Sequence, residues 1–131
     1  MNILKPVDIE NEVRLALTDY FEAYCRPLPK SYGLPNVLVE QTGGGTENQI
    51  DTFQVRLSVR AETDADANDT MRSVLGVLQK RCEEQFGALR HMSINSQGGW
   101  STDPKRPDLK LYTALVLITT HRETVTISTL T

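Results

Sequence analysis

The side chains best suited to chemistry are two histidines and two cysteines, and their positions give them no shared site. His91 and His121 fall on different expected strands, with no second His or Cys at the spacing of metal ligands. Cys82 continues the apolar stripe of an expected helix, so we interpret it as a buried thiol. Cys25 precedes Arg26, which could lower its pKa slightly, but no histidine is placed to act as a base. The sequence therefore predicts no catalytic residue and no metal site.

Two other patterns resemble binding sites but have simpler explanations. The run Gly43, Gly44 and Gly45 resembles a phosphate loop, yet no Lys-Ser/Thr pair follows it and the next expected element is a strand. We interpret the segment 42–46 as a flexible connection. Acidic residues at the start of the second expected helix favour its dipole and need no ligand. These acids are Glu62, Asp64, Asp66 and Asp69.

Trp100 is the one large residue that the expected core does not explain. It stands in a Gly- and Pro-rich loop expected over residues 96–107. It either folds under that loop or anchors a partner. Together with Gly43, Gly44 and Gly45, it marks the candidate partner-contact loops.

Length and charge limit the classes of protein. The 131 residues fit a single domain, with short flexible termini expected at about 1–7 and 124–131. A net charge of −3 argues against a surface that binds nucleic acid by neutralising phosphates. The chain begins without the basic and apolar segments of a signal peptide, and no apolar run is long enough to span a bilayer. We expect a cytosolic globular protein without membrane contacts.

Apolar periodicity predicts the order helix, strand, strand, helix, strand, strand. The helices are expected from the N-cap Asp8 to about Tyr24, and from Thr63 or Asp64 to a closing Gly87, with a Pro-rich link at 26–35 between the first helix and the first strand. The strands are expected at 37–41, 52–61, about 88–95, and 108–122. This pattern predicts an α+β domain with a four-stranded, mainly antiparallel sheet and two helices packed on one face.

The last expected strand is apolar on both faces. Its odd positions carry leucines, and its even positions carry Tyr112, Ala114, Val116 and Ile118. Two helices cover only one face of such a sheet, so another chain is expected to cover the second face. Because leucines are the better core fillers, the even residues are the candidate subunit interface. The alternative is a monomer in which the N-terminal arm and the Pro-rich link fold over that face.

A longer pattern resembles a known family. The run VLVEQTGG at 37–44 is followed by Asp51-Thr52-Phe53 at the start of an alternating strand, and then by an Ala/Asp-rich amphipathic helix. This pattern resembles the tail terminator (tail completion) proteins in the neck of long-tailed bacteriophages. The element order, size and acidic charge are similar too, so the resemblance covers about residues 8–122. The Pro-rich link and the loop around Trp100 depart from the family pattern.

The resemblance implies a non-enzymatic structural protein of the virion without a cofactor, located in the tail or neck and assembled in the host cytoplasm. Its subunits would form a homo-oligomeric ring, commonly a hexamer, that caps the tail tube and joins it to the head-side connector protein. DNA would pass through without specific binding, along an acidic or neutral lumen. The candidate lining residues are Glu40, Glu47 and the acids at the start of the second expected helix. The alternatives are another neck or head-completion protein, or a small ligand-binding α+β domain.

Overall fold

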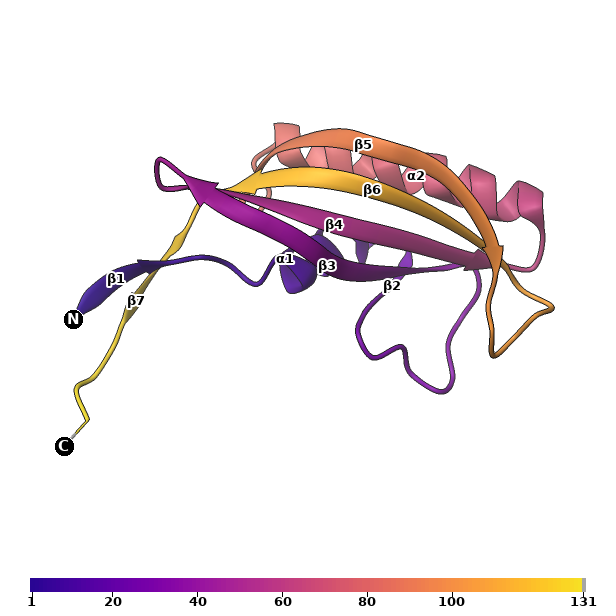
Figure 1. Ribbon diagram of the computed structural model, residues 1–131, viewed down its shortest axis with the longest axis horizontal. Coiled ribbons are helices and arrows are strands. Elements are labelled where there is room, and N and C mark those ends of the chain that lie inside the picture. Colours follow the sequence, from indigo (N-terminus) through magenta and orange to yellow (C-terminus); the bar gives the residue numbers. More distant parts are fainter. Residues whose placement is uncertain (131) are drawn as a thin grey trace.

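The computed structural model describes residues 1–130, which form two packed layers and a projecting ribbon (Figure 1). A five-stranded sheet has the order β2–β3–β4–β6–β5. Its strands are β2 Glu22–Cys25, β3 Asn36–Glu47, β4 Ile50–Ala61, β5 Leu89–Thr102 and β6 Lys110–Thr120. Helices α1 Ile9–Leu17 and α2 Asp64–Glu83 cover one face of this sheet. Strands β1 Asn2–Lys5 and β7 Glu123–Thr126 pair with each other in a separate two-stranded ribbon.

The expected four-stranded sheet is wrong, although the fold is α+β. The first helix ends at Leu17 and not near Tyr24, and the residues after it form β2, which pairs in parallel with β3. Tyr20 and Tyr24 continue the helical period, so the sequence pattern concealed the strand. What stabilises β2 is its pairing with a distant segment, in which Ala23 lies opposite Val37. Tertiary pairing of this kind overrides a short local pattern.

Helix α2 begins as expected but ends differently. The Thr63 hydroxyl accepts a hydrogen bond from the backbone N–H of Asp66 at 3.1 Å, which makes Thr63 the N-cap. The first left-handed residue after the helix is Gln85, with φ of 55°, and not the expected Gly87. The N–H groups of Gln85 and Phe86 donate to carbonyls of the last turn, so a non-glycine residue closes the helix.

Arg81 joins the two helices. Its Nε donates to the carbonyl of Ala16 in the last turn of α1, at 3.1 Å, and so satisfies a carbonyl that has no partner within the helix. Its guanidinium also lies over the ring of Phe86, 4.4 Å from the ring centroid. One cation thereby fixes α1 against the C-terminal end of α2.

The core lies between the helices and the covered face of the sheet, and it includes the even residues of β6. Ala114, Val116 and Ile118 are fully buried there. The expected subunit interface at Tyr112, Ala114, Val116 and Ile118 is therefore corrected: these residues face the helices, with Tyr112 partly buried against the core. The register explains this, because the inward residues of β4 lie opposite them. Phe53 pairs with Ile118, Val55 with Val116, and Leu57 with Ala114.

Strand β5 is an irregular edge of the sheet. Its pairing with β6 shifts register at three places, between Leu89 and His91, between Ile94 and Ser96, and between Gln97 and Gly99. Despite these bulges it continues to Thr102, well beyond the expected end near residue 95. Trp100 therefore lies in a strand and not in a loop.

The facing of β6 can be tested with two neighbouring substitutions. Val116→Asp places a charge in the closed core, and we expect it to destabilise the fold by more than about 4 kcal/mol, enough to unfold it. Leu117→Asp lies on the uncovered face, where the carboxylate reaches water, and we expect a loss of roughly 1–2 kcal/mol with the fold retained. Urea unfolding followed by circular dichroism measures both, and a folded Val116→Asp variant would contradict the observed facing.

Candidate assembly surface

The face of the sheet turned away from the helices carries a row of half-buried leucines on β6, here called the leucine row. Its members are Leu111, Leu115 and Leu117. Their register partners on β4 are Arg60, Arg56 and Gln54. Their partners on β5 are Ser101, Ser96 and Ser93. An apolar stripe with polar borders is typical of a surface that contacts another protein.

The β5–β6 loop covers one end of the leucine row. Asp103 in this loop accepts a hydrogen bond from Arg60 Nε at 3.0 Å, and both side chains are largely buried. Burial raises the pKa of Asp103, but hydrogen bonds from the Lys105 backbone and from Arg60 outweigh it and hold the pKa below its ordinary value. This charged pair fastens the loop to the sheet, so the open part of the row is the end nearest Leu117.

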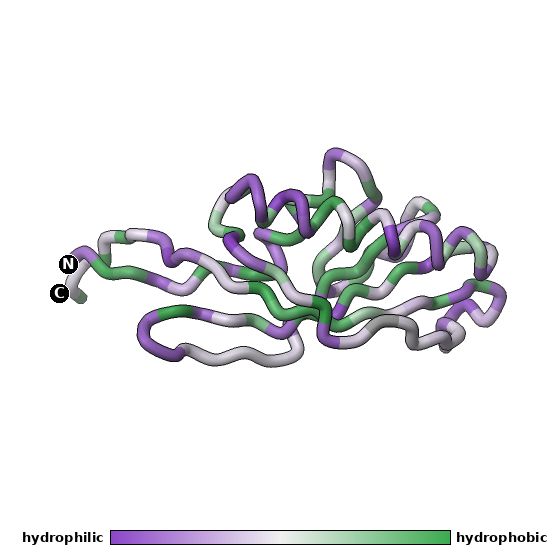
Figure 2. The backbone as a smooth tube through the Cα atoms, turned by 90° about the horizontal axis from the view of Figure 1, so that it is seen from above, coloured by the Kyte–Doolittle hydropathy of each residue, from purple (hydrophilic) through white to green (hydrophobic). Residues whose placement is uncertain are grey.

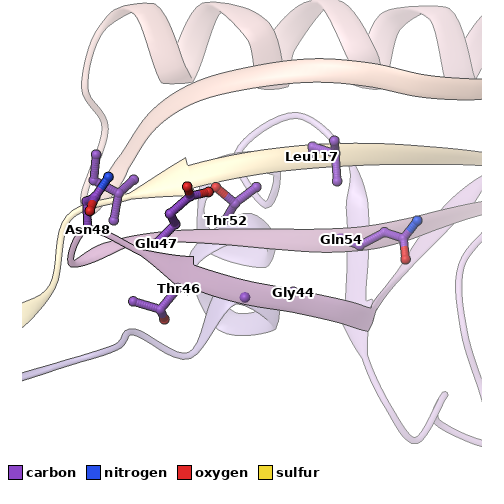
Figure 3. A pocket seen from close by; sticks show the side chains of 9 residues that line it. Gly44, Thr46, Glu47, Asn48, Thr52, Gln54 and Leu117 are labelled. Atoms are coloured by element: carbon purple, nitrogen blue, oxygen red, sulfur yellow. The ribbon is translucent and has the colours of Figure 1, made fainter.

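A hollow of about 650 Å³ lies at that open end, between Leu117 and the hairpin of β3 and β4 (Figure 3). Its lining includes Gly44, Gly45, Thr46, Thr52 and Gln54. Glu47 is the only ionisable side chain among the lining residues. The hollow thus offers a leucine, hydroxyl and amide groups and exposed backbone, which are contact groups and not an acid–base pair.

The glycines expected in a flexible connection belong to β3. After a bulge between Gln41 and Gly43, β3 stays paired with β4 to its end at Glu47. The turn lies beyond it, at Asn48 and Gln49, whose φ values are 52° and 64°. Two consecutive left-handed residues are characteristic of a two-residue hairpin turn with the twist of the strands it joins. The candidate contact segment is therefore an ordered hairpin.

A buried ion pair anchors this hairpin to the start of β7. The guanidinium of Arg122 donates two hydrogen bonds to the carboxylate of Asp51, each of 2.8 Å. The Thr46 hydroxyl donates a third, of 2.6 Å. Asp51 is only 3% exposed, and the hydrogen bonds from Arg122 hold its pKa below the ordinary value even though burial raises it. One carboxylate thus fixes the turn end of the hairpin and the base of the ribbon.

The β1–β7 ribbon projects from the same end of the sheet as the hairpin (Figures 1 and 2). Ile3 lies opposite Val125, and the N–H of Ile127 donates to the carbonyl of Met1. These residues share one face of the ribbon, because side chains on one face recur at every second position. Neither strand packs extensively on any other described helix or strand. The ribbon therefore presents an apolar face to its surroundings.

Trp100 lies on the helix side of the sheet, near the far end of β5. Its ring meets the ring of Tyr112 edge to face, with centroids 4.5 Å apart and an interplanar angle of 88°. Nearly half of Trp100 is still exposed, at 49%. The exposed part borders a hollow against the first turns of α2, lined by Asp64, Asn68 and Arg72.

The reactive side chains stay apart. Burial raises the pKa of the Cys82 thiol to about 11. Burial also raises the pKa of Cys25, opposite to the effect expected of Arg26. His91 and His121 are exposed. Within residues 1–130, no three His, Cys, Asp or Glu side chains gather as metal ligands would.

The sequence analysis missed the Asp51–Arg122 pair. It also expected flexible termini at about 1–7 and 124–131, and this is corrected, because β1 and β7 pair there to form the ribbon. It treated Arg122 as the end of a strand and Asp51 only as part of a motif. The available signal for the ribbon was the alternation of Val125 and Ile127 with threonine and serine, which indicates a strand with one apolar face. No pattern in the sequence links that segment to Ile3, because the pairing joins opposite ends of the chain.

The chain matches no protein-family model, and no curated protein is significantly similar to it. Neither helix in the described part of the chain is both long and apolar enough to cross a membrane.

The hairpin geometry predicts opposite results at adjacent glycines. Gly44 has a φ of 150°, and a Cβ there would lie 2.7 Å from the Thr52 carbonyl oxygen. We expect Gly44→Ala to destabilise the protein by about 1–3 kcal/mol through backbone strain. Gly45 has open space around it, so Gly45→Ala is expected to be neutral or slightly stabilising. Thermal unfolding of the two variants checks this, and equal midpoints would contradict the hairpin geometry.

The Asp51–Arg122 pair predicts a dependence of stability on pH. The Asp51 carboxyl titrates near pH 3.9 when unfolded and lower when folded, so its contribution is complete above that value and is lost as the pH falls through the folded pKa. At pH 7, Asp51→Asn leaves the guanidinium without its counter-charge and is expected to cost about 2 kcal/mol. The difference from the wild type should shrink below about pH 4.

The matched control is the exposed ion pair of Arg106 and Asp108, whose Nη2–Oδ2 distance is 2.9 Å. Water screens this pair, so Asp108→Asn should leave the stability at pH 7 nearly unchanged. Urea unfolding at several pH values measures both variants. If Asp51→Asn and Asp108→Asn behave alike, the buried pair does not anchor the hairpin.

Proposed function

We propose that this protein is a non-enzymatic structural subunit of a bacteriophage neck, a tail terminator that forms a ring, caps the tail tube and joins it to the head-side connector. The observation that carries the proposal is the leucine row on a sheet face that no helix covers. Burying apolar surface stabilises an assembly by about 25 cal/mol per Å². A row of leucines flanked by polar side chains is therefore suited to a protein partner, which covers its open end.

The residues behind the family resemblance support the same proposal. The segments 37–44 and 51–53 lie on the two strands of one projecting hairpin, anchored at Asp51. A hairpin held next to its turn presents a fixed shape to the end of a tube. Identical subunits in head-to-tail contact form a ring when the rotation between neighbours closes, and a closed ring leaves no free lateral surface for further subunits. The resemblance favours a hexamer.

The charges around the open face are compatible with a ring through which DNA passes without being bound. Glu40 is paired with Arg56 at 3.2 Å, so neither presents an uncompensated charge. Glu47 is exposed at the end of β3. A lumen lined by such residues would be neutral or acidic and would not hold the phosphate backbone. The protein would reside in the virion and require no cofactor.

Disruption of the gene in its phage tests the proposal. We expect filled heads beside unattached tails, many of them overlong, because a tube without its cap continues to grow. Electron microscopy of the lysate measures both the attachment and the tail length. Tails of normal length joined to heads would refute the assignment, and empty or unstable heads would indicate a head-completion protein instead.

Complementation with variants supplies the control. The wild-type gene on a plasmid should restore joined particles. Leu117→Asp, which is expected to fold, should fail to restore them because it places a charge in the leucine row. Asp108→Asn, which changes a solvent-exposed ion pair, should restore them.

A further inference from the structure

The exposed apolar side chains of this chain include two groups that lie apart. One group is on the ribbon and includes Ile127, which is 49% exposed. The other is on the helix side of β5 and consists of Ile94, 41% exposed, and Trp100, 49% exposed. The ribbon projects from one end of the sheet, and β5 ends at the opposite end (Figure 1).

The second group borders a groove between α2 and β5. Two hollows, of about 360 and 620 Å³, share Arg72 in their linings. Along α2 they are lined by Asn68, Arg72, Gly76 and Gln79, which recur at helical spacing on one side of the helix. No heavy atom lies within 4 Å of a Cβ added at Gly76, so this glycine leaves the groove open.

The ribbon is an element that needs a partner. Two strands alone are marginally stable in water, and no other strand of residues 1–130 pairs with either outer edge of this ribbon. Its apolar face, with Ile3, Val125 and Ile127, meets no other described helix or strand extensively. Whatever covers this face must be apolar and long enough to receive a four-residue ribbon, about 13 Å in length.

The groove is about as long as the ribbon and offers an apolar surface. Ile94 and Trp100 lie opposite Val116 and Tyr112, which are four positions apart on β6, or about 13 Å. The two apolar surfaces are different in shape and lie toward opposite ends of the molecule. Such a pair fits a head-to-tail contact between copies, the kind of contact that a ring repeats.

We propose that the β1–β7 ribbon of one subunit docks in the groove between α2 and β5 of the next copy of this chain, with its apolar face on Ile94 and Trp100. This contact rests on the proposed ring and identifies its lateral interface. The leucine row is then left for the protein above or below the ring.

Two variants test the contact, one by changing the ribbon and the other by changing the groove. Val125→Asp places a charge on the apolar face of the ribbon, and its control Thr124→Asp places one on the opposite face. Gly76→Arg fills the groove, and because glycine is a poor helix residue this change should raise the unfolding midpoint. Its control is Ser73→Arg, at an exposed position of α2 that lines neither hollow.

Native mass spectrometry and analytical ultracentrifugation of the full chain measure the outcome. We expect the wild type and both controls to form the same ring, and each of the two test variants alone to be monomeric. An equimolar mixture of Val125→Asp and Gly76→Arg contains one intact ribbon and one intact groove per pair. It should give a heterodimer of twice the subunit mass and nothing larger.

Other outcomes separate the two proposals. If Gly76→Arg still forms the wild-type ring, or if the mixture stays monomeric, the ribbon does not dock in this groove, while the terminator assignment stands. A Gly76→Arg dimer in which two ribbons pair with each other would also overturn the docking. A wild type that is monomeric at every concentration contradicts the ring itself.

Discussion

Two helices can cover only one face of a five-stranded sheet, and the rest of this molecule follows from that constraint. The covered face receives Ala114, Val116 and Ile118 from β6, which fit beneath the helices. The leucines of the same strand are left on the other side. A strand that is apolar on both faces therefore indicates that its second face contacts another molecule. Here the chain's own loop covers only part of that face, through the ion pair of Arg60 and Asp103.

The ribbon shows a related division between a rigid base and a free end. It leaves the sheet beside the turn of the hairpin, where Asp51 receives hydrogen bonds from both Arg122 and Thr46. Beyond that point the apolar residues of the ribbon contact no other described helix or strand extensively. A segment fixed at one end and unsatisfied at the other has a defined direction in which to reach a neighbour. Because the base of the ribbon is already ordered, binding to a neighbour does not have to order the whole segment, and less conformational entropy is lost.

The features that the sequence predicted are those set by local patterns. The alternation of β4, the cap at Thr63 and the stripe of α2 all depend on near neighbours, and each was predicted correctly. The errors came from distant pairing. Residues 22–25 looked helical because Tyr24 keeps the helical period, and β2 exists only through its contact with β3. The facing of β6 was reversed because volume alone favoured leucine in the core, whereas the register with β4 decides it. Three glycines suggested flexibility, but Gly44 serves close backbone approach within a paired strand.

The three register shifts of β5 bear on how such a protein avoids uncontrolled association at high concentration. A regular edge strand offers a straight row of backbone donors and acceptors, and a like strand from any other copy can extend it into a fibre. In β5 the extra residues interrupt that row and increase the twist of the strand. A straight strand from another copy therefore cannot pair along the whole of β5. This edge of the sheet is thus protected from amyloid-like growth by its own irregularity. The shape of the side chains, and not backbone pairing, then determines which molecules this subunit binds.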